Sequence, residues 1–193
     1  MKELNPKLLG KRIIIDVGHG GKDSGTVYDT VKEKDLNLSI ALKLKEELIM
    51  NGVEVIMTRD EDYDLSLPNA NRRKKSDFDN RIDMINNSDA DMYLSIHINY
   101  LGNAKYYGAQ VFYTKGNREI ANSIQNEFIN DLKSPMKSRM LSNDIYMYKK
   151  LKIPGVLIEC GFLSNNKERN LLSDDKYQYR IVESIVEGLI NYY

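Results

Sequence analysis

The chain has 193 residues, of which 28 are Lys or Arg and 28 are Asp or Glu, so its formal net charge is zero. A chain of this length can bury most of its apolar surface in one core, which predicts a single domain over residues 1–193. The balanced charge argues against non-specific nucleic-acid binding. The single cysteine, Cys160, excludes an intramolecular disulfide and any multi-cysteine metal site.

Targeting signals are absent from the printed sequence. No apolar run approaches the ~18 residues that a transmembrane helix needs, and the first twelve residues, MKELNPKLLGKR, lack the apolar core of a signal peptide. The protein is therefore expected either to be cytosolic or to depend for export on a segment that this sequence does not contain.

The first part of the chain predicts a β–loop–α–β unit. The isoleucines at 13–15 predict a buried strand, and a glycine-rich loop around His19 follows them. From residue 35 the apolar side chains recur at the helical period as far as Asn51-Gly52, a common helix end. Residues 53–58 alternate as a second strand. Such a unit favours a parallel sheet.

The rest of the chain continues this alternation. Residues 60–79 are expected to form a polar surface loop with the start of the next helix, or else a functional loop beside a cleft. The strands expected after this loop cover residues 91–99, 109–114, 144–148 and 156–162. The expected helices cover residues 80–87, 118–132, 165–172 and 177–193, and residues 133–143 are expected to form a basic, irregular loop.

His19 and His97 are the only histidines, and each lies at the end of a predicted strand. A single histidine in such a place is more often structural, but two on the same edge of a parallel sheet favour a zinc site. A catalytic zinc site needs a third ligand, and Glu33 is the best-placed carboxylate. Asp23 and Asp35 compete with it, and a glutamate there is also favoured by the helix dipole alone.

Glu159 interrupts an otherwise apolar strand, where an ionised carboxylate is costly unless it is paired. It is predicted to be a general acid/base with a pKa raised by desolvation, the alternative being a strand-end glutamate that faces solvent. Its neighbour Cys160 must face the opposite side of a regular strand, so it is interpreted as a small buried hydrophobe. Together these residues predict metal-assisted hydrolysis.

Six motifs in order resemble the zinc-dependent N-acetylmuramoyl-L-alanine amidases of the type-3 amidase family over nearly the whole chain. They are IIIDVGHGGKDSG, KEKDLNLSIALKLKEEL, VIMTRD, DNRIDMINNSDADMYLSIHIN, GAQVFYT and IPGVLIECGFLSNNKE. The resemblance implies an α/β fold, a three-layer α/β/α sandwich with a mixed, largely parallel central sheet. It also implies that His19, Glu33 and His97 bind one Zn²⁺ per chain. The glutamate of LIECGF, Glu159, is then the catalytic acid/base.

The substrate implied is the amide between the lactyl group of N-acetylmuramic acid and L-alanine in peptidoglycan stem peptides. Val17 stands where the family usually has proline, which affects the stiffness of the loop and no ligand. Arg81 resembles an arginine that precedes the SIH strand of the family. It is interpreted as structural or as a minor substrate contact.

Two segments, RRKKSDFDNR and IYMYKKLKIPGVLIECGFLSN, most resemble the germination-specific amidases of the spore cortex, which act in muramic-δ-lactam formation. The resemblance therefore implies an exported protein of the cell wall or developing-spore envelope, with peptidoglycan as its partner. An accessory activating protein is also expected, although the 13 tyrosines that would suit such a contact are ordinary surface residues too. Membrane association is expected only through a segment outside this sequence.

Four other functions remain as alternatives. They are a vegetative cell-wall amidase for autolysis or cell separation, a catalytically silent peptidoglycan-binding module, a cysteine hydrolase that uses Cys160, and a zinc peptidase that acts on peptide cross-links. The complete set of candidate ligands and acid/base argues against the silent module. Strand alternation argues against the cysteine hydrolase, and the released products would identify a peptidase.

Overall fold

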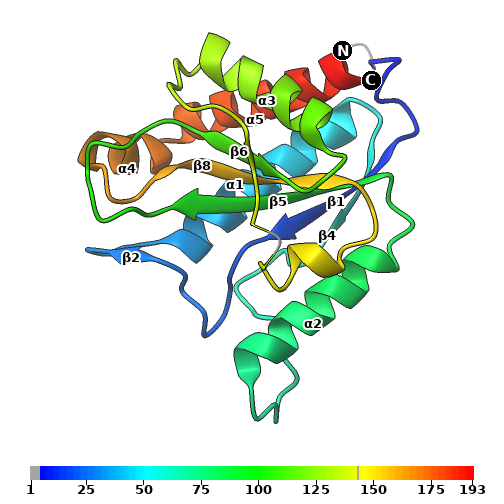
Figure 1. Ribbon diagram of the computed structural model, residues 1–193, viewed down its shortest axis with the longest axis vertical. Helices are drawn as coiled ribbons and strands as arrows, with labels where there is room; N and C mark the ends of the chain where they lie inside the picture. The colour runs from blue at the N-terminus through cyan, green and yellow to red at the C-terminus, as the bar shows by residue number, and fades with distance from the viewer. Residues whose placement is uncertain (1–4, 143) are drawn as a thin grey trace.

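A six-stranded sheet lies at the centre of the molecule, with helices on both of its faces (Figure 1). This computed structural model describes residues 5–142 and 144–193. The sheet strands are β1 (Arg12–Val17), β4 (Glu54–Met57), β5 (Met92–Asn99), β6 (Gln110–Tyr113), β7 (Arg139–Met140) and β8 (Gly155–Phe162). A small separate hairpin pairs β2 (Val27–Tyr28) with β3 (Val31–Lys32).

The helices cover the sheet unevenly. They are α1 (Glu33–Met50), α2 (Arg73–Asn86), α3 (Arg118–Asn130), α4 (Asn166–Leu172) and α5 (Asp175–Tyr192), with a short 3-10 turn η1 (Tyr148–Lys150). One face packs on α1, α3 and α5, and the other packs on α2 and the segment that contains η1 (Figure 1). The predicted three-layer α/β/α sandwich is therefore confirmed.

The strand order is β4-β1-β5-β8-β6-β7. β1 pairs in parallel with β4 and β5, and β5 pairs in parallel with β8. β6 runs antiparallel to β8 and parallel to β7, so the sheet is mixed and largely parallel, as predicted. Because β1, β5 and β8 are adjacent and parallel, their carboxyl ends share one edge, where open α/β sheets bind ligands.

The alternation of side chains along β1 divides the core in two. Ile13, Ile15 and Val17 face the larger cluster beneath α1, α3 and α5. Ile14 faces the smaller cluster formed with α2 and η1. Asp16 has the same parity as Ile14, so its carboxylate enters the interior on the α2 side, where it is buried.

Two predicted elements differ from the structure. α2 begins at Arg73 and not at residue 80. The sequence pattern did not indicate its first turns, because they carry exposed basic residues and lack an apolar stripe. The strand expected at 144–148 is wrong: residues 144–147 form a turn and η1 follows. Tyr148 is buried there and its ring stacks on Tyr93, so this segment covers the sheet instead of joining it. The irregular loop expected at 133–143 contains the two-residue strand β7.

The other predicted boundaries agree with the structure within a few residues. α3 ends two residues earlier than expected, and α5 begins two residues earlier because the side chain of Asp174 accepts a hydrogen bond from the backbone amide of Tyr177. Within the described part of the chain, no helix combines the length and the apolar character required to cross a membrane.

Candidate active site

Three predicted ligands meet at the carboxyl edge of the sheet. His19 follows β1, Glu33 opens α1, and His97 lies near the end of β5. Glu33 Oε1 is 3.1 Å from His19 Nε2 and 3.0 Å from His97 Nδ1. The candidate ligand atoms of the three residues lie within 4.8 Å of one another, and the described residues contain no second group of this kind. Two imidazole nitrogens and one carboxylate oxygen are a donor set that suits zinc with an open position.

The backbone around His19 is unusual. His19 has a φ of 59°, in the left-handed region that side chains other than glycine rarely adopt. Gly18 packs directly on the ring of His97. A Cβ at this position would lie 2.3 Å from His97 Cε1, which is too close for any residue other than glycine. The GHG sequence therefore allows the loop to approach His97 closely and turns the His19 ring towards Glu33.

Asp23 lies on the other side of His19. Its Oδ2 is 3.1 Å from His19 Nδ1, which leaves Nε2 directed at Glu33. A carboxylate on the second nitrogen of a ligand histidine orients the ring and makes it more basic. The structure therefore places Asp23 behind the candidate ligand, and Asp35 is not part of the three-residue group.

The electrostatics of this cluster favour a cation. Burial lowers the pKa of His19, but hydrogen bonds with Asp23 and Glu33 outweigh burial and raise this pKa to about 9. Burial raises the pKa of Glu33, but hydrogen bonds with His19 and His97 outweigh burial and hold this pKa well below its usual range. Glu33 and Asp23 thus remain ionised around the histidines, and their negative charges attract a cation.

Glu159 projects from β8 beside this group, in register with His97 on β5. Its Oε2 atom is buried and has no hydrogen-bond partner among the described residues. Burial raises the pKa of Glu159 to about 8, and the charge of Glu33 adds to this effect. A buried carboxyl oxygen without a hydrogen bond is costly if its role is only structural. The Oε2 atom of Glu159 is therefore available to interact with water, substrate or a cation.

Cys160 points away from this site. It belongs to the core beneath α1, α3 and α5, and burial raises the pKa of its thiol. A fully buried, protonated thiol is a poor nucleophile, which argues against the cysteine-hydrolase alternative.

Two concave regions meet at the cluster. A cavity of about 240 Å³ is lined by His19, His97 and Glu159 and has apolar walls from Phe78, Ile145, Tyr146, Met147 and Leu157. A shallower and more polar groove on the other side includes the same two histidines and Glu159 with Thr26, Lys74, Asn99 and Tyr100. A scissile group at the cluster would therefore have an apolar recess on one flank and an open polar groove on the other.

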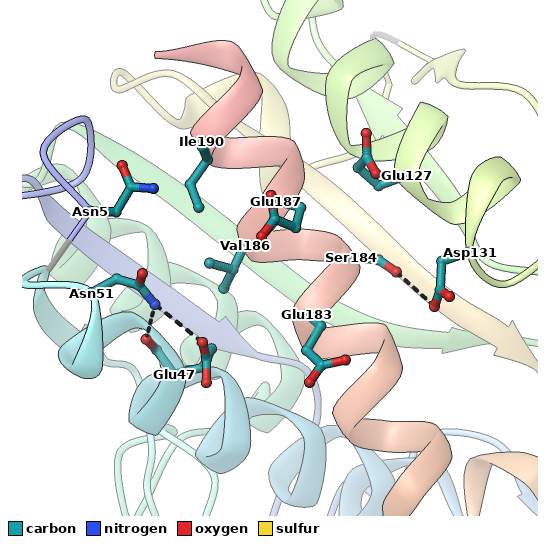
Figure 2. A pocket seen from close by; sticks show the side chains of 10 residues that line it. All are labelled: Asn5, Glu47, Asn51, Glu127, Asp131, Glu183, Ser184, Val186, Glu187 and Ile190. Atoms are coloured by element: carbon teal, nitrogen blue, oxygen red, sulfur yellow. Dashed lines mark hydrogen bonds between the residues drawn. The ribbon is translucent and has the colours of Figure 1, made fainter. Parts of the chain in front are cut away.

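Another cavity lies away from this cluster, on the side of the sheet covered by α1, α3 and α5. It measures about 420 Å³, and half of its lining residues are acidic, among them Glu47, Glu127, Glu183 and Glu187 (Figure 2). Neither histidine nor Glu159 lines it. This cavity is therefore separate from the candidate active site.

A family model of the N-acetylmuramoyl-L-alanine amidases matches residues 13–191. The chain belongs to this family. The amidase is 39% identical to the germination-specific N-acetylmuramoyl-L-alanine amidase of Bacillus subtilis, over 96% of this chain and 81% of that protein.

Solved structures agree with this assignment. The amidase is similar to the CwlD amidase of Clostridioides difficile, solved in complex with the GerS lipoprotein. The TM-score is 0.89 and the identity 42%, covering 94% of this chain and 98% of that one. It is also similar to an N-acetylmuramoyl-L-alanine amidase from Clostridium difficile 630, with a TM-score of 0.83, 32% identity, and coverage of 94% and 96% of the two chains.

Beneath the loop of the amidase that carries His19, Arg81 of α2 is almost fully buried. It donates to Asp77 Oδ2 and Asp16 Oδ1, both at 2.9 Å, and to the carbonyl oxygens of Val17 and His19. Burial lowers the pKa of Arg81, but the two carboxylates outweigh burial and raise it. These contacts support the structural interpretation of Arg81, and its contact with substrate stays a prediction.

A second buried arginine, Arg59, was not recognised in the sequence. It follows β4, and all of its hydrogen bonds go to backbone carbonyl oxygens around the site. Burial lowers the pKa of Arg59 to about 10, and neighbouring Arg81 adds to this effect. The available signal was the position of the TRD tripeptide, at the carboxyl end of a strand that pairs with β1.

Proposed function

We propose that this amidase hydrolyses the amide between the lactyl group of N-acetylmuramic acid and L-alanine, with one zinc ion per chain. The observation that supports the proposal most directly is the convergence of His19, Glu33 and His97 beside the unpartnered Oε2 of Glu159. The two imidazoles and Glu33 would hold the zinc ion. When bound, zinc supplies Lewis acidity, which polarises a carbonyl group and makes water more acidic.

Glu159 moves the proton in this reaction. Its Oε2 accepts a proton from the attacking water while the water oxygen adds to the lactyl carbonyl carbon. The same atom then returns the proton to the leaving nitrogen as the C–N bond breaks. The products are a lactyl carboxylate and a stem peptide with a free L-alanine amine. Because a nearby cation favours an ionised carboxyl group, Glu159 is expected to lose its proton more readily once the cluster is loaded.

The apolar recess and the polar groove suit an amide whose two sides carry chemically different groups. The apolar walls of the recess limit the access of bulk water to the buried Oε2 of Glu159, and the open groove leaves space for a chain that continues beyond the scissile bond. Asp23 holds the His19 ring, so the His19 nitrogen that faces Glu33 is oriented before a metal binds.

The setting that we propose is the spore cortex, where the reaction would supply the muramic acid from which muramic-δ-lactam forms. The similarity to the germination-specific amidase of Bacillus subtilis supports this setting. The complex of the Clostridioides difficile CwlD amidase with the GerS lipoprotein supports an accessory protein as a partner. Peptidoglycan lies outside the cytoplasm, so an exported protein of the cell wall or developing-spore envelope is part of the proposal.

The test combines elemental analysis of the purified protein with mass spectrometry of digested peptidoglycan. Cortex and vegetative-wall peptidoglycan are digested in parallel with wild-type protein, metal-depleted protein and the Glu159→Gln variant. One zinc ion per chain and stem peptides with free L-alanine amines, seen only with loaded wild-type protein, are the expected result. Release from vegetative walls alone would contradict the cortex role. New amines at cross-links would indicate a peptidase, and neither zinc nor release would favour a binding module.

A further inference from the structure

Arg59 links two separate segments that carry candidate metal ligands. Its Nη2 donates to the carbonyl oxygen of Gly18 at 3.1 Å and to that of Lys34 at 2.8 Å. Gly18 directly precedes His19, and Lys34 directly follows Glu33. A single guanidinium nitrogen therefore joins the carbonyl group of the residue before His19 to that of the residue after Glu33.

The remaining donors of Arg59 continue the same pattern. Nε donates to the carbonyl oxygen of Val17 at 3.3 Å, and Nη1 donates to that of Glu61 at 3.0 Å. The side chain thus connects the end of β1, the start of α1 and the segment after β4. A planar guanidinium can hold four acceptors in fixed directions, which the single ammonium of lysine cannot do.

A stabilising role alone accounts poorly for this arrangement. Arg59 is 1% exposed, and among residues 5–142 and 144–193 no carboxylate lies within ion-pair distance of it. The carboxylates of Asp62, Asp16 and Asp35 act on its charge only at longer range. A buried charge without a direct ion pair is a weak source of stability, and an apolar side chain of similar volume commonly serves as well.

The loop is also shaped around Arg59. Gly20 has a φ of +134°, and a Cβ at this position would lie 2.8 Å from Arg59 Nε. The closest atom to this Cβ would be the backbone carbonyl oxygen of Tyr63, at 2.2 Å, so the glycine that follows His19 leaves space for both the Tyr63 backbone and the Arg59 side chain. His19 is flanked by a carbonyl that Arg59 holds on one side and by this glycine on the other.

We propose that Arg59 is a positioning residue, which sets the spacing between His19 and Glu33 so that the metal site is formed before the metal binds. This inference rests on the proposed function, because it takes His19 and Glu33 as zinc ligands. The hydrogen bonds of Arg59 go to backbone carbonyl oxygens and not to either ligand side chain. Arg59 acts on these side chains through the backbone of Gly18 and Lys34.

The test measures metal affinity and metal geometry in Arg59→Lys and Arg59→Gln. Zinc dissociation constants are obtained by competition with a chromophoric chelator, and cobalt(II) replaces zinc for absorption spectra at saturation. Both variants are expected to bind zinc about tenfold to a hundredfold more weakly than wild type. Their cobalt spectra are expected to change in position or intensity, because the distance between the two ligands is no longer held.

Arg169→Lys is the matched control. Arg169 is also largely buried and donates to a backbone carbonyl, that of Leu163, but it touches neither Gly18 nor Lys34. Its variant is expected to keep the zinc affinity and cobalt spectrum of wild type. Thermal melts in chelator report the fold of every variant without metal.

The outcomes separate this inference from the proposed function. Wild-type zinc affinity and an unchanged cobalt spectrum in either folded Arg59 variant would overturn the positioning role. If neither variant folds in chelator, Arg59 is a structural residue and the proposal is also overturned. If wild-type protein itself binds no stoichiometric zinc, the proposed function fails first.

Discussion

Replacing Arg81 by methionine tests the buried network under the loop that carries His19. The change keeps an apolar side chain of similar length in α2 but removes the cation between Asp16 and Asp77. Asp16 is 1% exposed and would retain only its hydrogen bonds from Ser95, at 2.6 Å, and Thr58, at 3.3 Å. Two buried carboxylates would thus lose the positive charge that they share.

The expected loss of stability follows from this burial. Removing one partner of a buried ion pair costs ~3–5 kcal/mol, because the charge left behind is uncompensated. Each kcal/mol lowers the melting temperature of a chain of this length by ~2–4 °C, so Arg81→Met should melt ~6–20 °C below wild type at pH 7.

The loss of stability in Arg81→Met should depend on pH, and the pKa of Asp16 determines the direction of this dependence. In wild type, burial raises the pKa of Asp16, but Arg81 and Ser95 outweigh burial and hold it below its unfolded value. The Asp16 contribution is therefore present above pH ~4 and is lost as the pH falls through the lowered folded pKa. Without Arg81, burial prevails and the Asp16 pKa rises above the unfolded value. The variant then gains a proton on folding. Its loss of stability relative to wild type should therefore become smaller as the pH falls from 7 to 4.

The assay is urea and thermal denaturation in chelator, so that metal binding contributes nothing. Arg180→Met is the control, because Arg180 pairs with Asp131 at 3.2 Å on the surface and should cost at most ~1 kcal/mol. An Arg81→Met loss below ~1 kcal/mol, or a loss that does not shrink at pH 4, would refute this reasoning. A stable variant with a raised KM would instead support the predicted contact of Arg81 with substrate.

Four further predictions concern the site. Glu159→Gln should keep one zinc ion but lose ~100- to 10,000-fold in kcat, and near wild-type release of stem peptides would exclude it as the base. His97→Ala should bind no zinc, as measured by elemental analysis. Stoichiometric zinc in this variant would show that His97 is not a ligand. Asp23→Asn should lower the affinity for zinc ~10- to 100-fold, as measured by chelator competition, whereas an unchanged affinity would show that Asp23 does not orient His19. Zinc affinity should rise with pH up to about 9, because His19 must release its proton, and calorimetry in two buffers should detect that release.

The fold could be predicted from the sequence wherever hydrophobic periodicity was strong. The isoleucine run of β1 and the apolar stripe of α3 place those elements within a few residues. The start of α2 could not be found this way, because its first turns face solvent and are held by a few specific contacts. The segment 144–148 has the composition of a strand, but the tertiary position of Tyr148 over Tyr93 decides its conformation.

The candidate site was predictable in part. The two histidines are conspicuous because the sequence has no others, but spacing could not separate Glu33 from Asp23 and Asp35 without the family resemblance. In the structure Glu33 and Asp23 lie on opposite ring nitrogens of His19, a distinction that depends on loop geometry. Arg59 was missed because the position of TRD at a strand end does not by itself show that the arginine is buried and bound to carbonyl groups.

The pairing of strands far apart in the chain has a consequence for the order of events in folding. Ser95 and Asp16, which meet beneath the site, are 79 positions apart, and His97 and Glu33 are 64 apart. Such non-local contacts form slowly, and a metal ion finds no binding site until the parallel strands have come together. Unlike a zinc finger, which the ion itself folds, this chain should complete its hydrophobic core first and acquire the metal last. A chelator should then yield a folded, inactive protein that regains activity when zinc is restored.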